Sequence, residues 1–161
     1  MKKYSKTIYL FLIGIIALIS GCSDEKEVLI VEPVERINEL YITGAAVGWA
    51  SKAMQKDAEI PNVFTYEVSL TYNDENKLFK FTREQGDWDK IRYLVPTAPD
   101  YNGYTKIAAA GTEHEMSMVS QMAGNLRDHF WGIGKGADGK YRLTVDAGKL
   151  KLKIERIGNI P

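Results

Sequence analysis

Lys149-Leu150-Lys151-Leu152-Lys153-Ile154 decides the fold class, because lysine and aliphatic residues alternate along it one by one. Successive side chains of a β-strand point to opposite faces, so the pattern predicts a strand with one buried and one solvated face. Residues 141–145 alternate in the same way, and Asp146-Ala147-Gly148 supplies turn residues between the two segments. The sequence therefore predicts a hairpin near its C-terminal end.

Further segments upstream repeat this period of two. Residues 63–70 place aromatic and aliphatic side chains on one face and polar ones on the other, and residues 40–43, 79–81 and 91–95 are shorter versions. Gly44, the polar run 73–76 and Asp138-Gly139 separate these segments, and the last is a typical hairpin turn. Seven or eight short strands with polar turns predict an all-β fold, a two-layer antiparallel sandwich.

The stretch 105–128 is the least decided part of the chain. Residues 112–124 fit a short helix, with Thr112 and Glu115 as a capping box and Gly124 as its C-cap. The methionines of the same stretch fit an extended segment equally well. Residues 96–111 are rich in Pro, Gly, Tyr and Asn and are interpreted as a long loop, a feature often associated with function.

The N-terminal residues have the pattern of a secretion signal. Three lysines precede residues 8–19, an almost wholly apolar run that is shorter than the roughly 20 residues of a membrane-spanning helix. The run ends in Ile19-Ser20-Gly21-Cys22, which resembles a bacterial lipobox and contains the only cysteine of the chain. We expect residues 1–21 to be a signal peptide and Cys22 to carry lipid. The alternative is an uncleaved anchor with a chance cysteine.

The segment after Cys22 predicts an acidic linker over residues 22–37, followed by a β-sandwich domain over residues 38–161. Ser23-Asp24-Glu25-Lys26-Glu27 resembles the surface-export signal of Bacteroidetes lipoproteins. Residues 28–31 are apolar, so part of this linker fits an edge strand instead.

Composition excludes several classes of function. The chain has 161 residues with 21 basic and 21 acidic side chains, so its charge gives no reason to expect a nucleic-acid partner. A single cysteine and two histidines leave little for a metal site, and Glu113-His114-Glu115 lacks the second histidine of a zinc motif. Asp87 and Asp89 are too close for either glycosidase geometry, and a polar turn explains them better. We expect no enzyme activity, no metal and no cofactor.

Two tryptophans are the candidate binding residues. Trp49 and Trp88 both follow predicted strands and are flanked by glycine or aspartate, which places them in loops. An indole in a loop is poorly hydrated unless it covers something, and the C–H face of a sugar ring stacks on such a surface. Burial in the core is the competing interpretation for both. Trp131 lies in a strand-like segment and is assigned to the core.

The ordered motifs of the chain resemble the SusE/SusF family, the outer-membrane starch-binding lipoproteins of Bacteroidetes. The resemblance covers about residues 38–156 and is carried by the ordered set Glu39-Leu40-Tyr41-Ile42-Thr43-Gly44, Val63-Phe64-Thr65-Tyr66-Glu67-Val68, Leu78-Phe79-Lys80-Phe81, Gly86-Asp87-Trp88, His129-Phe130-Trp131-Gly132-Ile133 and Gly139-Lys140-Tyr141-Arg142-Leu143-Thr144-Val145-Asp146.

That resemblance implies an immunoglobulin-like or carbohydrate-binding-module sandwich that holds a glycan at the cell surface without cleaving it. It implies Trp49 and Trp88 as stacking plates, and Lys80, Lys90 and Arg92 are candidate polar partners by proximity. An α-glucan is the implied ligand, and an outer-membrane glycan-import complex is the implied assembly. Family members usually join several such modules, whereas one is visible here. The alternative is a structural or protein-interaction lipoprotein that has lost the sugar site.

Overall fold

The computed structural model describes residues 35–74, 78–98, 104–120 and 126–161, and these residues form one compact unit. The described residues contain eleven β-strands and no α-helix, which confirms the all-β prediction. Their strands are β1 Tyr41–Thr43, β2 Lys52–Ala53, β3 Gln55–Lys56, β4 Val63–Leu70, β5 Lys80–Thr82, β6 Tyr93–Pro96, β7 Thr105–Ile107, β8 Glu113–Val119, β9 Phe130–Gly132, β10 Gly139–Asp146 and β11 Lys151–Gly158, with a 3₁₀ turn η1 at Ala45–Val47. None of the described residues belongs to a helix long and apolar enough to cross a bilayer.

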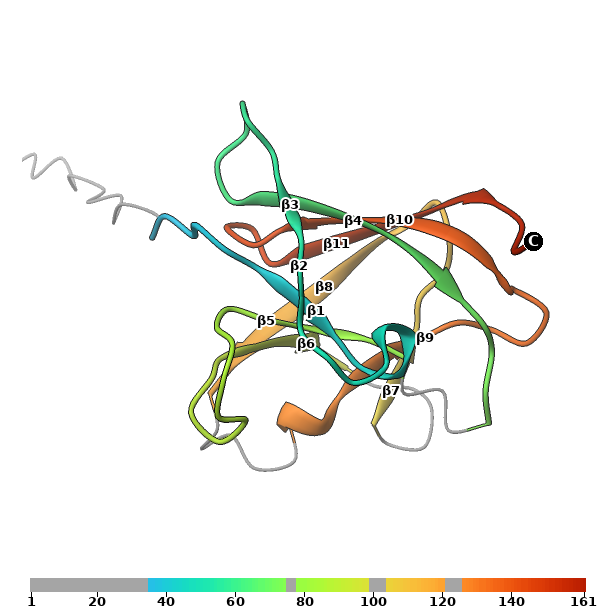
Figure 1. Cartoon of the computed structure of the whole chain (residues 1–161), viewed down its shortest axis with the longest axis horizontal. Coiled ribbons are helices and arrows are strands. Elements are labelled where there is room, and N and C mark those ends of the chain that lie inside the picture. The colour runs from blue at the N-terminus through green and yellow to red at the C-terminus, as the bar shows by residue number, and fades with distance from the viewer. Residues whose placement is uncertain (1–34, 75–77, 99–103, 121–125) are drawn as a thin grey trace, which may run out of the picture. The chain divides into compact units, whose positions relative to one another are not determined.

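Nine strands form an antiparallel sheet in the order β2-β1-β5-β6-β8-β11-β10-β4-β3, which folds over at β8 (Figure 1). The N-terminal half of β8 pairs with β11, and its C-terminal half pairs with β6. This divides the sandwich into a first sheet, β2-β1-β5-β6-β8, and a second sheet, β8-β11-β10-β4-β3. At the opposite edges, β2 pairs with β1 and β3 pairs with β4, so the short segment 52–56 joins the two sheets.

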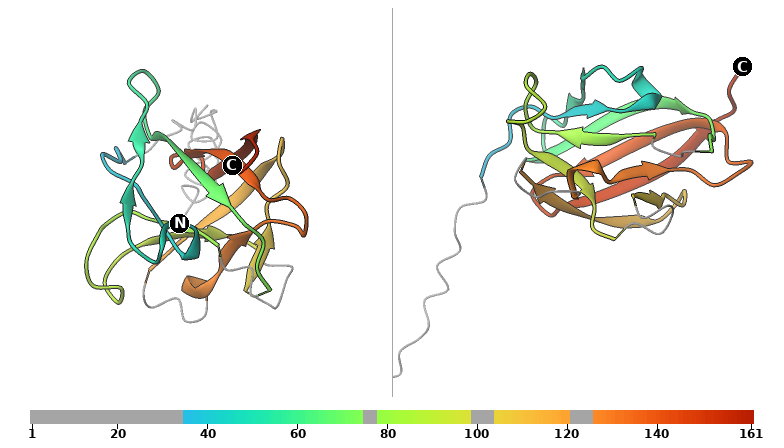
Figure 2. Two further views of the ribbon diagram at one scale, coloured as in Figure 1. Left: turned by 45° about the vertical axis from the view of Figure 1, so that its right-hand side comes forward. Right: turned by 90° about the horizontal axis from the view of Figure 1, so that it is seen from below.

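The core lies between the two sheets and follows the alternation of the sequence. Leu152 and Ile154 are fully buried while Lys153 is exposed. In the neighbouring strand, Leu143 and Val145 are also fully buried. Burying each such side chain contributes about 1.5–3 kcal/mol before entropic costs, which is why the pattern dictates the fold. Figure 2 shows the β10–β11 hairpin, in orange and red, beside the green β4 in both views, and the hairpin prediction is confirmed.

Two details of the expected secondary structure are wrong, and one open alternative is decided. Residues 113–119 form strand β8, so the extended alternative for this stretch is confirmed over the helix, and Thr112 of the supposed capping box donates its hydroxyl to the Ala109 carbonyl. The supposed C-cap, Gly124, lies outside the described residues. The stretch 96–111, interpreted as loop, contains the whole of β7. The Asp138-Gly139 turn does not close a hairpin, because β9 pairs in parallel with β7 while β10 pairs with β4 and β11. In each case pairing with distant strands outweighs a local signal.

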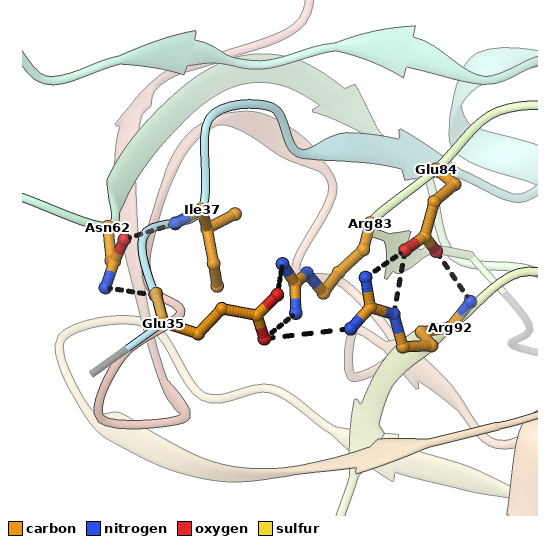
Figure 3. A network of polar contacts seen from close by, with 6 residues as sticks. All are labelled: Glu35, Ile37, Asn62, Arg83, Glu84 and Arg92. Atoms are coloured by element: carbon orange, nitrogen blue, oxygen red, sulfur yellow. Dashed lines mark hydrogen bonds and ion pairs between the residues drawn. The ribbon is translucent and has the colours of Figure 1, made fainter. Parts of the chain in front are cut away.

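The described chain begins with a segment that is fastened to the sandwich (Figure 3). The Ile37 amide donates to Asn62 Oδ1 at 2.7 Å, and the Ile37 side chain is buried in the core. Arg83 binds both carboxylate oxygens of Glu35, at 2.8 and 3.1 Å. Residues 35–37, assigned to the linker by sequence, therefore belong to the domain. The predicted signal peptide, the lipid-bearing Cys22 and the apolar run 28–31 lie outside the described residues.

Candidate functional site

The floor of the candidate site is the outer face of the first sheet. Ile42, Phe81 and Leu94 point from this sheet into the core and are fully buried. Strand periodicity turns their neighbours to the other side, and the register places Thr43 opposite Lys80 and Tyr93 opposite Thr82. These outward residues are nevertheless buried, because loops cover this face of the sheet.

The loops leave a cavity of about 360 Å³ above this floor. Its walls come from the turn after β1, the loop between β5 and β6, and the segment that leads into β9. The lining residues are Thr43, Trp49, Lys80, Trp88, Asp89, Tyr93, Arg127, Asp128 and Phe130. Four of these nine side chains are aromatic, and two cationic groups are matched by two carboxylates.

Trp49 reaches the cavity through a turn that requires glycine. Gly44 has φ +118°, and a Cβ there would lie 2.4 Å from the Leu78 carbonyl oxygen. The 3₁₀ turn η1 follows and is capped by Gly48, and Trp49 comes next in the left-handed conformation at φ 61°, with its amide donating to the Gly44 carbonyl at 2.8 Å. Such a backbone costs about 1–3 kcal/mol at a non-glycine residue and is common at ligand-binding positions. The indole is 55% exposed and packs edge-on against Phe130, with centroids 5.7 Å apart.

Trp88 forms the opposite aromatic wall. It lies in a turn that Asp87 stabilises by accepting the Asp89 amide at 3.1 Å, which confirms the polar-turn interpretation of this pair. The indole is 44% exposed. It lies nearly parallel to the Tyr93 ring, at an interplanar angle of 15° and a centroid distance of 6.5 Å. The Tyr93 hydroxyl donates to the Trp88 carbonyl, so ring and backbone are both held.

Lys80 lies on the floor of the cavity. Its side chain is 6% exposed, and its ammonium lies 4.4 Å from the Tyr93 ring centroid and 4.3 Å from that of Phe130. The ammonium also donates to the Arg127 carbonyl. Burial lowers the pKa of Lys80 to about 8, while the charge of Asp128 opposes this lowering. Each cation–π contact contributes about 0.5–2 kcal/mol and offsets part of the desolvation cost.

Polar groups complete the lining. Arg127 forms an ion pair with Asp89 at 2.7 Å, which bridges the loop after β5 and the segment before β9. The Thr43 hydroxyl is buried and has no hydrogen-bond partner among the described residues. An unpaired buried hydroxyl costs about 1–3 kcal/mol, so a ligand that supplied a partner would recover that cost. Within the described ranges, no three His, Cys, Asp or Glu side chains are grouped as a metal site would require.

The structure brings three of the five sequence-predicted binding residues together: Trp49, Trp88 and Lys80. The other two do not line the cavity. Lys90 is paired with Asp87 at 3.0 Å on the exposed side of the loop, and Arg92 binds Glu84 and lies 3.7 Å from Glu35 (Figure 3). Trp131 is 1% exposed in β9 and belongs to the core, as predicted.

Sequence reasoning missed Thr43, Tyr93, Arg127, Asp128 and Phe130 as parts of the cavity. The alternation of the sequence could have indicated Thr43 and Tyr93, because each is next to a residue that points into the core and therefore lies on the outer face of its strand. Arg127, Asp128 and Phe130 reach the site through the pairing of β9 with residues near β5, where the Trp131 amide donates to the Phe79 carbonyl at 2.7 Å. That contact could not be predicted from any local sequence pattern.

Comparisons with known proteins give little beyond this geometry. No family model matches the chain, and no curated protein matches it. The chain is similar to the crystal structure of SusF from Bacteroides thetaiotaomicron, with 17% identity and a TM-score of 0.42. The match covers 76% of this chain and 24% of the SusF chain, so this chain corresponds to about a quarter of that protein.

Proposed function

We propose that this protein is a non-catalytic glycan-binding module. The observation that carries the proposal is the pair of half-exposed indoles, Trp49 and Trp88, in the walls of one cavity. A pyranose ring presents a face of C–H groups that stacks on an indole, and its rim of hydroxyl groups needs hydrogen-bond partners. The cavity offers both kinds of surface within one small volume.

Hydroxyl groups of a bound glycan have partners on the floor and the rim. The Thr43 hydroxyl lacks a partner, and Asp89, Arg127 and Asp128 present charged groups, whose hydrogen bonds are about twice as strong as neutral ones. A glycosidase would need two carboxyl groups available for proton transfer and attack. Asp89 is engaged by Arg127, so the cavity favours retention of a sugar over its cleavage.

The cellular setting of the proposal rests on the sequence. A signal peptide over residues 1–21 and acylation of Cys22 would tether the domain to the outer membrane, facing the cell exterior. The resemblance to SusE/SusF makes starch-type α-glucans the first ligands to test, and a glycan-import complex the first assembly. Incorporation of a labelled fatty acid, lost in Cys22→Ser, and protease sensitivity on intact cells would test the anchor and its side of the membrane.

Affinity electrophoresis tests the binding function. The chain from residue 23 onward, which contains the whole compact unit, is run in native gels containing starch, glycogen or other polysaccharides. We expect retardation by at least one polymer, and loss of it in Trp49→Ala or Trp88→Ala. Arg142→Ala is the matched control, because Arg142 pairs with Glu67 on the second sheet. Unretarded migration across a broad panel would contradict the proposal and favour a structural or protein-interaction lipoprotein.

A further inference from the structure

We propose that Lys80 is a positioning residue that holds both indole walls of the cavity in place, and that it is not the group that reads the glycan hydroxyls. The inference deepens the proposed function and rests on it for its link to glycan affinity. Its structural part concerns the free protein and is testable without a ligand.

Two chains of contacts run from the Lys80 ammonium to the two indoles. On one side the ammonium lies over Tyr93, which stacks on Trp88 and donates its hydroxyl to the Trp88 backbone. On the other side it lies over Phe130, whose ring meets Trp49 edge-on. A single charged group therefore supports both walls through one aromatic ring each.

The contacts also use the hydrogen-bonding capacity of the ammonium. An ammonium group has three N–H donors. One goes to the Arg127 carbonyl, and the Tyr93 and Phe130 rings lie on two further sides at cation–π distance. With 6% of the residue exposed, Lys80 is less accessible to a ligand in the cavity than the charged rim, where the side chains of Asp89 and Arg127 are 73% and 37% exposed.

The hydrogen bond to Arg127 fixes the third wall segment. It attaches residue 127 to β5, and the ion pair of Arg127 with Asp89 then ties the same segment to the Trp88 loop. The groups that face Lys80 are Tyr93 from β6 and Arg127 and Asp128 from the segment before β9. The low pKa of Lys80, about 8, agrees with an ammonium enclosed by protein.

The first experiment measures order at the indoles in the free protein. The steady-state ¹⁵N NOE of each tryptophan Nε1–H is recorded for the unsubstituted chain from residue 23, for Lys80→Met and for Lys80→Arg. Methionine keeps an unbranched side chain that is one atom shorter and uncharged, while arginine keeps the charge and stacks on aromatic rings. We expect the NOE of Trp49 and of Trp88 to fall in Lys80→Met, to recover at least half of the loss in Lys80→Arg, and to stay unchanged at the buried Trp131.

Unchanged NOE values at Trp49 and Trp88 in Lys80→Met would overturn the inference, and a drop in glycan affinity under those conditions would make Lys80 a direct ligand contact. Thr82→Val is the control, because Thr82 is buried on the same face but does not line the cavity. If the NOE values of Trp49 and Trp88 fall in Lys80→Met but no form of the protein binds a glycan, the inference about Lys80 holds and the proposed function is wrong.

A second measurement uses the unsubstituted chain and covers the case in which Lys80→Met does not fold. The indole signals are followed from pH 6 to pH 10. Both Trp49 and Trp88 should shift with one common midpoint near 8, and Lys80→Arg should abolish that transition. Indoles that do not respond, or that respond at two separate midpoints, would contradict a single ammonium supporting both.

Discussion

The two outer faces of the sandwich differ in what covers them. On the second sheet, side chains form cross-strand ion pairs in solvent: Arg142 with Glu67 at 2.7 Å, and Lys151 with Glu113 at 3.4 Å. On the first sheet, Thr43, Lys80 and Tyr93 occupy equivalent outward positions and are buried beneath loops. The same period of two that builds both sheets thus produces a charged surface on one and a lined cavity on the other.

The difference arises from the connections and not from the strands. The first sheet is overlaid by the turn 44–49, the loop 83–92 and the segment 126–130, each of which supplies one wall of the cavity. The stem of the middle loop is braced by Glu35, which binds Arg83 and approaches Arg92 (Figure 3). Strands supply a rigid floor, and loops supply the chemistry.

Breaking the turn below Trp49 should have the largest effect. In Gly44→Ala the new methyl group would meet the Leu78 carbonyl at 2.4 Å on a left-handed backbone. We expect the free energy of unfolding to fall by about 2–4 kcal/mol, from overpacking and the backbone penalty together. Urea denaturation followed by circular dichroism measures it. Gly48→Ala is the control, because Gly48 also has a positive φ but open space around it, and an equal loss there would contradict the steric explanation.

Removing an indole comes next. Trp88→Ala should weaken binding of the retarding glycan at least tenfold, since loss of a stacked aromatic surface costs about 1.5–3 kcal/mol. Affinity electrophoresis at graded polymer concentrations gives the dissociation constant. Arg142→Ala on the second sheet should leave it unchanged. If Trp88→Ala and Arg142→Ala weakened glycan binding equally, the claim that only the outer face of the first sheet binds glycan would be contradicted.

The buried hydroxyls sharpen the comparison within the first sheet. Thr43 and Thr82 both carry a buried hydroxyl with no partner among the described residues, yet only Thr43 lines the cavity. Thr43→Val should weaken glycan binding by about 1 kcal/mol, roughly fivefold, while Thr82→Val should not change it. Calorimetric titration with an oligosaccharide measures the difference, and a larger effect at Thr82 would refute the role of Thr43.

The charges of the second sheet should have the smallest effect. The Lys153 ammonium lowers the pKa of Glu155 below its usual 4.5. A carboxyl whose pKa is lowered by folding stabilises the protein above its unfolded pKa, and this stabilisation is lost as pH falls through the folded pKa. Glu155→Gln should leave the melting temperature at pH 7 unchanged within error and slightly flatten its decline below pH 4.5. A clear loss at pH 7 would contradict a solvent-screened pair.

The strands could be predicted from the sequence, but the way in which loops cover the outer face of the first sheet could not. Leu152 and Ile154 identify their strand because they alternate with Lys151 and Lys153, and a strand places the two apolar side chains on one face and the two lysines on the other. Trp49 and Trp88 could be placed in loops from their glycine and aspartate neighbours. The segment 113–119 could not be decided from its sequence, because a helix and an extended segment fitted it equally well, and pairing with β6 and β11 selects the strand. Arg127 and Phe130 could not be placed, since their position depends on β9 pairing beside Phe79, about fifty residues away in the chain.

The three tryptophans allow one direct measurement of the central claim, that a glycan binds on the outer face of the first sheet between Trp49 and Trp88. A ¹⁵N-labelled chain is titrated with the oligosaccharide form of the retarding glycan while the indole Nε1–H signals are recorded. The signals of Trp49 and Trp88 should move together and saturate with one dissociation constant, while that of buried Trp131 stays in place. A glycan that binds without moving Trp49 and Trp88, or that shifts the β4–β10–β11 face instead, would contradict the claim.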